Sequence, residues 1–166
     1  ENMDEFHEDV GFVVRDGYQL TLKGRRTLNK KERILYNEEY DTNQPDTYAG
    51  WWYCCIPASV IERSGYALPV FVRGDDTEYS LRNHAKFITM NGICVWHLGF
   101  VTKFSYFMEY YQVFRNFLIA TACNGNMKMQ ENIMEHFVGQ FLTEILRYNY
   151  DATEFFVDAV RDFLKG

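Results

Sequence analysis

Proline and glycine are scarce in this 166-residue chain, at 3 and 11 residues, which argues against a low-complexity, disordered protein. No apolar run approaches the roughly 20 residues needed to span a bilayer. Positive charge is also in short supply: 17 Lys and Arg stand against 23 Asp and Glu, a formal net charge of −6. A general nucleic-acid binder needs a basic face, so this balance argues against one. The 47% apolar and 17% aromatic residues instead predict a well-packed globular core.

The sequence holds only four cysteines, without the density of a secreted disulfide framework or the spacing of zinc ligands. Cys54 and Cys55 are neighbours, and neighbouring cysteines seldom bridge each other because the disulfide would strain the peptide between them. We therefore predict four reduced, mostly buried thiols and a cytoplasmic location. The acidic N-terminus opens without an initiator Met, so it is not a signal peptide, and we expect the chain to be part of a longer protein.

Local patterns predict short strands in the first hundred residues. Two β-prone runs flank Asp16-Gly17, a pair that suits a type I′ turn, so residues 12–22 are predicted to form a hairpin. The charge-rich residues 25–40 fit either a loop or a short exposed helix. A helix is expected over residues 77–84. A further strand is expected over the aromatic run of residues 50–57, which ends at a proline. Three apolar runs are also expected to be strands, residues 67–72, 87–90 and 93–96.

From residue 101 onward the apolar residues recur at helical spacing. This period predicts three helices, around residues 104–118, 133–146 and 156–164, with a break at residues 123–126. The predicted fold class is therefore α/β. A short mixed sheet within residues 1–100 would be followed by a helical extension of about three helices, residues 101–166, packed on it.

An acidic cluster is the first candidate for chemistry, since G-x-S-x-G, P-loop, G-x-G-x-x-G and H-E-x-x-H signatures are all missing. Asp75, Asp76 and Glu78 crowd together just before the predicted helix. Like charges raise one another's pKa unless a cation or the amides of a helix N-terminus stabilise the charged forms. The cluster fits a catalytic carboxylate site or the acidic first turn of a helix, and local sequence alone favours the helix start.

A histidine and a tryptophan pair are the other candidates. His97 ends an apolar strand-like run, where a neutral imidazole could reach a metal, although an isolated histidine is more often bonded to backbone. Trp51 and Trp52 are adjacent, and adjacent strand residues face opposite ways, so one of them is expected to line a groove. Flat aromatic rings stack on the apolar C–H faces of sugars, which would be one use of that surface.

These motifs occur in one order along the chain: Gly50-Trp51-Trp52, then the segment from Pro69 to Arg82 with its acidic cluster, then Trp96-His97, then Tyr110 to Asn116. In this order they resemble the second half of the catalytic domain of family 2 glycosyltransferases. The resemblance covers residues 48–120 and is closest to the galactofuranosyltransferase-like branch, whose polymerising members build bacterial cell-wall galactan. It implies the C-terminal half of a GT-A-type domain, with the acceptor and base side in residues 1–100.

The resemblance also implies roles for individual residues. Asp76, with Asp75 beside it, matches the general base that deprotonates an acceptor hydroxyl as it attacks the anomeric carbon with inversion. His97 matches a histidine that helps hold Mn²⁺ or Mg²⁺ on the donor diphosphate. Arg115-Asn116 match a helix motif behind the site with a structural role. The acceptor-site residues of the family match two aromatics and a carboxylate here, Trp51, Trp52 and Glu78.

One departure is that the D-x-D motif of the family's donor half, which binds metal and nucleotide, occurs nowhere in this sequence. The resemblance therefore implies a piece of a metal-dependent, inverting glycosyltransferase. The full enzyme would transfer a sugar such as galactofuranose from a nucleotide sugar such as UDP-galactofuranose to a glycan acceptor in cell-wall or surface polysaccharide synthesis. Glucosyl or rhamnosyl transfer would fit the same residues. We expect the 166-residue chain alone to be inactive.

The expected partners are the nucleotide sugar and the glycan acceptor, at the inner face of the membrane, with no nucleic acid and no transmembrane segment in this chain. Association of copies through sheet edge uncovered by a missing donor half stays open. An alternative from another class is a non-catalytic carbohydrate- or protein-binding module that uses the tryptophan surface and the helical tail. A third is that Asp75, Asp76 and His97 are separate structural residues on a glycosyltransferase-like fold.

Overall fold

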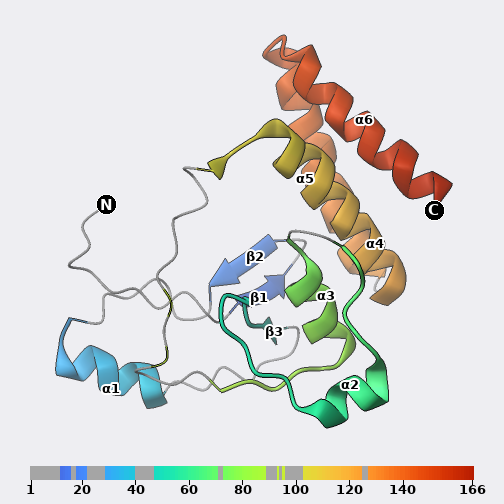
Figure 1. Cartoon of the computed structure of the whole chain (residues 1–166). Coiled ribbons are helices and arrows are strands. Elements are labelled where there is room, and N and C mark those ends of the chain that lie inside the picture. The colour runs from blue at the N-terminus through green and yellow to red at the C-terminus, as the bar shows by residue number, and fades with distance from the viewer. Residues whose placement is uncertain are drawn as a thin grey trace. The chain divides into compact units, whose positions relative to one another are not determined.

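A computed structural model of the chain describes most of its helical regions and parts of its first hundred residues (Figure 1). The described residues are 12–15, 18–21, 29–39, 47–70, 73–88, 93, 95, 103–124 and 127–166. The elements within them, in chain order, are β1 (Phe12–Arg15), β2 (Tyr18–Thr21), α1 (Lys31–Glu39), β3 (Thr47–Tyr48), α2 (Ala58–Ser64), α3 (Asp75–Arg82), the π-helix η2 (Phe107–Val113), α4 (Phe114–Asn124), α5 (Met127–Leu146) and α6 (Tyr150–Lys165).

The chain divides into two compact units, and each is described by itself. The first unit comprises Glu1–Arg15, Gln19–Tyr66 and Tyr79–His97. The second comprises Asp16–Tyr18, Ala67–Glu78 and Leu98–Gly166. The helical tail of the second unit therefore packs together with the short segment that carries the acidic cluster.

A small sheet with the strand order β2-β1-β3 lies at the start of the chain. β1 pairs with β3 in antiparallel register, Phe12 opposite Tyr48 and Val13 opposite Thr47, and both β3 residues are buried. The predicted strands on either side of Asp16-Gly17 are confirmed, since β1 and β2 are neighbours in the sheet. Helix α1 resolves the two alternatives for residues 25–40 in favour of a short helix, and its described side chains are exposed.

The strand predicted over residues 50–57 is wrong. Residues 51–53 form a turn and residues 54–57 have no regular structure. The Trp52 ring folds back over Gly50, where a Cβ would stand only 2.5 Å from it, and this close contact accompanies the turn.

The other predicted strands are not found where the structure describes their residues. Residues 67–70 have no regular structure, and neither do the described residues near the second pair of strands, Phe87, Ile88, Ile93 and Val95. The remaining residues of those runs lie outside the described part of the chain. The predicted helix at residues 77–84 is confirmed as α3, which begins two residues earlier.

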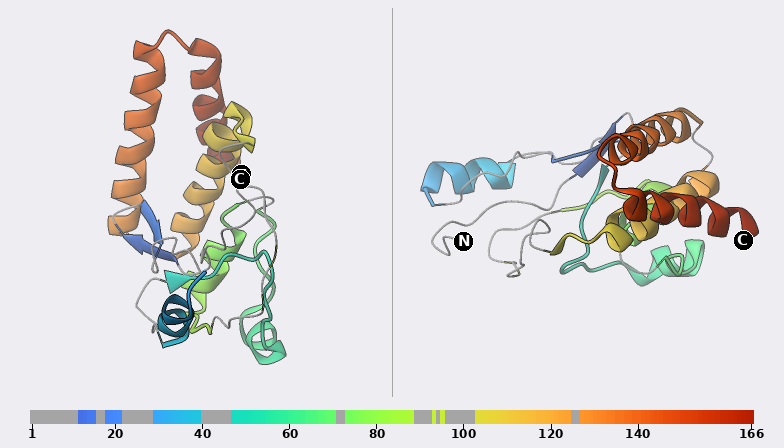
Figure 2. Two further views of the ribbon diagram at one scale, coloured as in Figure 1. Left: turned by 90° about the vertical axis from the view of Figure 1, so that its left-hand side faces the viewer. Right: turned by 90° about the horizontal axis from the view of Figure 1, so that it is seen from above.

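The three helices predicted after residue 101 are confirmed, and the first begins as the π-helix η2 before it continues as α4. Figure 2 shows α5 and α6 side by side in opposite directions. Their apolar faces meet α4 in a core of five buried residues, Phe114, Leu118, Phe137, Phe156 and Ala159. The ring centroids of Phe114 and Phe137 are stacked 4.2 Å apart. Stacked aromatic rings stabilise a core beyond the contribution of the apolar area they bury, so the three helices of the tail are held together firmly.

A buried carboxylate fastens the turn between α5 and α6 to η2. Glu144 is 4% exposed and accepts hydrogen bonds from the Tyr110 hydroxyl (3.0 Å) and from Asn149 Nδ2 (2.7 Å). Burial acts to raise the pKa of Glu144, but these bonds and the Arg147 charge outweigh it and leave that pKa below its ordinary value. For Tyr110, burial and the bond to Glu144 raise the pKa to about 12.

Two predictions about membranes and cysteines meet the structure differently. In the part of the chain that is described, no helix has the length and apolar character to cross a membrane. The prediction of mostly buried thiols is wrong, because Cys54, Cys55 and Cys123 are all exposed and none is in a disulfide. They lie on an irregular segment and near the end of α4, outside the apolar core. Cys94 lies outside the described residues.

The lowered pKa of Glu144 predicts a dependence of stability on pH. As the pH falls from the ordinary pKa of 4.5 through the lower folded-state value, the unfolded chain takes up the proton first, so the free energy of unfolding falls. Glu144→Gln should remove this component and, since it leaves a buried donor unsatisfied, cost about 1–3 kcal/mol at neutral pH. Urea unfolding at several values of pH measures both effects.

Glu154→Gln on the exposed side of α6 is the matched control, and it should shift stability by less than about 0.5 kcal/mol. Equal acid sensitivity of the Glu144→Gln variant and the unchanged chain would contradict the assigned role of Glu144.

Candidate functional site

The acidic cluster forms the first turn of α3. Asp75 and Asp76 are its first two residues, and both are partly buried. Asp76 Oδ1 accepts a hydrogen bond from the Thr77 amide at 2.7 Å, with the Thr77 hydroxyl 3.3 Å away. Glu78, the third carboxylate, is 0% exposed. The Thr77 amide thus holds the Asp76 carboxylate in one orientation at a helix start, where backbone amides favour negative charge.

The two residues before α3 have an uncommon backbone. Arg73 and Gly74 both have positive φ, 77° and 95°. Glycine is needed at position 74 for its backbone and not for space, because a Cβ there would make only an ordinary 3.5 Å contact with Asn116 Cβ. At Arg73 the same left-handed conformation is unfavourable, by about 1–3 kcal/mol, and persists only if neighbouring groups enforce it.

Three side chains supply that enforcement, and we name them the Arg73 clamp: Arg73, Glu109 and Asn116. Asn116 of α4 is 1% exposed and donates from Nδ2 to the Arg73 carbonyl at 2.7 Å. The Arg73 guanidinium forms an ion pair with Glu109 of η2. Gln112 Nε2 lies 3.4 Å from Asn116 Oδ1 and orients the amide. The clamp thus joins the segment that begins the acidic turn to the Tyr110–Asn116 motif, 43 residues further along the chain.

The predicted structural role of Asn116 has a concrete form in this clamp, whereas Glu109 and Gln112 were missed by sequence reasoning. A signal for Glu109 was present only as a charge opposite to that of Arg73. The π-helical geometry that brings Glu109 toward the turn leaves no pattern in the apolar spacing that we can identify.

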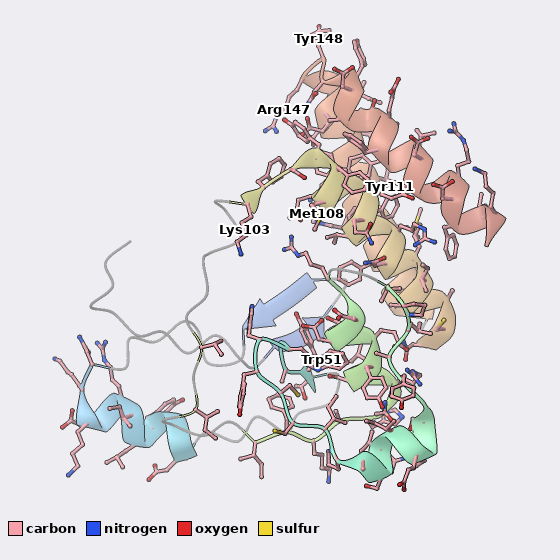
Figure 3. The ribbon with its side chains drawn as sticks, viewed as in Figure 1. Trp51, Lys103, Met108, Tyr111, Arg147 and Tyr148 are labelled. Carbon is pink, nitrogen blue, oxygen red and sulfur yellow. The ribbon has the colours of Figure 1, made fainter. Side chains whose placement is uncertain are left out.

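The tryptophan pair lies in the first unit. Trp51 is labelled in Figure 3. Its ring meets the buried Tyr79 ring edge-on at 5.7 Å, and Tyr79 donates to the Gly65 carbonyl at 2.8 Å. Trp51 and Trp52 are both partly exposed, and Tyr53 beside them is 66% exposed. These three aromatic residues lie on a turn instead of a strand, and the predicted groove beside one tryptophan stays a prediction.

His97 and the tryptophan before it lie outside the described residues, so the predicted metal ligand has no described position. Asp75 and Asp76 supply carboxylate oxygens, which suit Mn²⁺ or Mg²⁺, and an imidazole would suit Mn²⁺. Across the described ranges, no group of three or more His, Cys, Asp or Glu side chains is close enough to hold a metal. The metal site, for which His97 is the predicted ligand, therefore stays a prediction.

Two curated proteins match the chain, and no family model and no solved structure does. One is the galactofuranosyltransferase GlfT2 of Mycolicibacterium smegmatis, 30% identical over 123 residues, which are 72% of this chain and 19% of that protein. The other is the galactofuranosyltransferase GlfT2 of Mycobacterium tuberculosis, 30% identical over 125 residues, 72% of this chain and 20% of that protein. The chain is related to glycosyltransferases. It spans about a fifth of the length of these relatives.

The Arg73 clamp predicts an unequal effect of two asparagine substitutions in α4. Asn116→Ala removes the bond to the Arg73 carbonyl and should cost about 1–3 kcal/mol of unfolding free energy, because a buried acceptor loses its donor. It should also speed amide hydrogen exchange in residues 75–78. Urea unfolding and exchange mass spectrometry measure the two effects.

Asn124→Ala is the matched control, since Asn124 Nδ2 donates only to Ala120 of its own helix at 2.8 Å. It should leave exchange in residues 75–78 unchanged. Equal exchange in the two variants would show that Asn116 does not hold the turn.

Proposed function

We propose that this chain is the acceptor and base portion of an inverting, metal-dependent glycosyltransferase with a GT-A-type fold. The enzyme would transfer galactofuranose from a nucleotide sugar to a growing glycan in cell-wall or surface polysaccharide synthesis. The observation that carries the proposal is the Arg73 clamp. It joins two segments that both match the glycosyltransferase pattern, the acidic turn and the Tyr110–Asn116 motif. The similarity to two galactofuranosyltransferases over 72% of the chain supports the choice of sugar.

Asp76 is the proposed general base. A base must accept the proton of the acceptor hydroxyl as the oxygen attacks the anomeric carbon, so its carboxylate must be ionised and correctly oriented. The Thr77 amide provides orientation, and the start of α3 favours the charged form. The Arg73 clamp acts indirectly, because it fixes the backbone just before Asp75 and Asp76.

Trp51 and Trp52 are the proposed acceptor platform, where ring faces would stack on sugar C–H groups. Tyr79 supports the Trp51 ring from one side. The predicted contact of Glu78 with the acceptor stays a prediction; Glu78 is completely buried in the structure, and the contact would require its exposure.

Mn²⁺ or Mg²⁺ would be held in part by the proposed ligand His97. When bound, such an ion neutralises charge on the departing nucleotide diphosphate. The residues described here orient the acceptor and accept its proton. Because the D-x-D motif is missing from this sequence, we expect the donor to be held by another part of the protein and the chain alone to show no robust turnover.

Asp76→Asn in the full-length protein tests the proposed base. Asparagine keeps an oxygen that can accept the Thr77 amide, so the fold should survive, but it cannot take up the acceptor proton. The rate should fall by about 10²–10⁴-fold while the unfolding free energy changes by less than about 1 kcal/mol. Asp151→Asn, in the first turn of α6, is the matched control and should keep full activity.

Retained activity together with a loss of about 1 kcal/mol of unfolding free energy would assign Asp76 to helix capping alone.

The exposed aromatic surface favours a second candidate function, a carbohydrate-binding module without catalysis. In that case Trp51→Ala would abolish glycan binding and Asp76→Asn would change neither binding nor any measurable transfer.

A further inference from the structure

Two neighbouring thiols stand on the surface of the first unit. Cys54 and Cys55 are both exposed, and neither is in a disulfide. They directly follow the turn at residues 51–53 and lie in a segment without regular structure that ends at Pro57, the residue before α2. Cys123, near the end of α4, is also exposed but has no cysteine next to it in the sequence.

The placement of the pair makes reaction between the two sulfurs feasible. In a strand, adjacent side chains point to opposite faces, and in a helix they diverge as well. Cys54 and Cys55 themselves belong to neither a helix nor a strand, so a bond between them would form in an irregular segment. Because the two thiols sit on adjacent residues, each is the first group to reach any disulfide formed on the other.

A disulfide between adjacent residues is strained. A trans peptide separates adjacent Cα atoms by about 3.8 Å, whereas disulfides normally need about 4.4–6.8 Å. Strain raises the reduction potential, and strained, exposed disulfides are the labile ones. A bond between Cys54 and Cys55 would therefore serve poorly as a permanent brace and well as a reversible modification.

We propose that Cys54 and Cys55 form a reversible thiol switch that responds to low-molecular-weight disulfides. One thiolate attacks a sulfur of the disulfide RSSR, forms a mixed disulfide and releases RS⁻. The neighbouring thiolate then attacks the protein sulfur of that mixed disulfide, closes the Cys54–Cys55 bond and releases the second RS⁻. The two protein thiols lose two electrons to RSSR, and their two protons leave on two molecules of RSH.

The closed ring begins two residues after Trp52 and changes the backbone next to the Trp51–Trp52 surface. Oxidation would thereby alter the binding of a sugar there, a consequence that rests on the proposed function. The bond itself does not depend on that function.

Glutathione disulfide is the probe for the bond, applied to the intact chain and followed by peptide mass spectrometry. The peptide that carries Cys54 and Cys55 should lose two hydrogen atoms without keeping a glutathione adduct, and dithiothreitol should reverse the change. Cys55→Ser should instead hold a stable adduct on Cys54, as should Cys123 in both proteins. A persistent adduct on Cys54 or Cys55 of the unchanged chain, or no reaction there, would overturn the proposal.

Glycan binding by the reduced and oxidised chain separates the two ideas. Weaker binding after oxidation, restored by dithiothreitol and absent in Cys55→Ser, would support the switch and its effect on the tryptophan surface. Ring closure in a chain that binds no glycan in either state would leave the thiol pair established and count against the proposed function.

Discussion

The hydrogen bond from Asn116 to the Arg73 carbonyl is the contact on which the acidic turn depends. Two successive residues with positive φ are needed to direct the chain into α3, and only one of them is glycine. The cost of that conformation at Arg73 must be offset by contacts that the other conformations of the loop would lose. A buried amide on α4 and a carboxylate on η2 provide them. The position of Asp75 and Asp76 is therefore decided by residues far away in the sequence.

The π-helix explains how one short segment can serve several partners. Three consecutive residues of η2 each reach a different part of the second unit: Glu109 pairs with Arg73, Tyr110 donates to Glu144, and Tyr111 donates to Asp162 (2.9 Å). Stacking of Tyr110 on Phe156, with ring centroids 4.4 Å apart, ties the same segment to the aromatic core. Since π-helical turns are rare and often occur at functional sites, η2 fits a supporting role beside the proposed base.

The parts of the fold that follow from local chemistry were predictable. The apolar period located α4, α5 and α6, and the Asp16-Gly17 pair located two strands. The tryptophan run was misjudged because strand propensity was read from the aromatic side chains, whereas the run forms a turn in which the Trp52 ring covers Gly50. At the site, local sequence placed the carboxylates at a helix start, but the clamp spans 43 residues and depends on the backbone of η2. No local sequence pattern predicts the contact between Asn116 and Arg73 or the π-helical geometry of η2.

Capping and the proposed base role would place the same demands on the Asp76 carboxylate. The Asp76 carboxylate accepts a hydrogen bond from the Thr77 amide of the helix start, and this bond also restricts the orientation of the carboxylate. A general base benefits from the same two effects, a favoured negative charge and a fixed direction. Asp151, in the acidic first turn of α6, is exposed, whereas Asp76 is partly buried and accepts the Thr77 amide. What distinguishes α3 in the described structure is a completely buried carboxylate, Glu78, in its first turn.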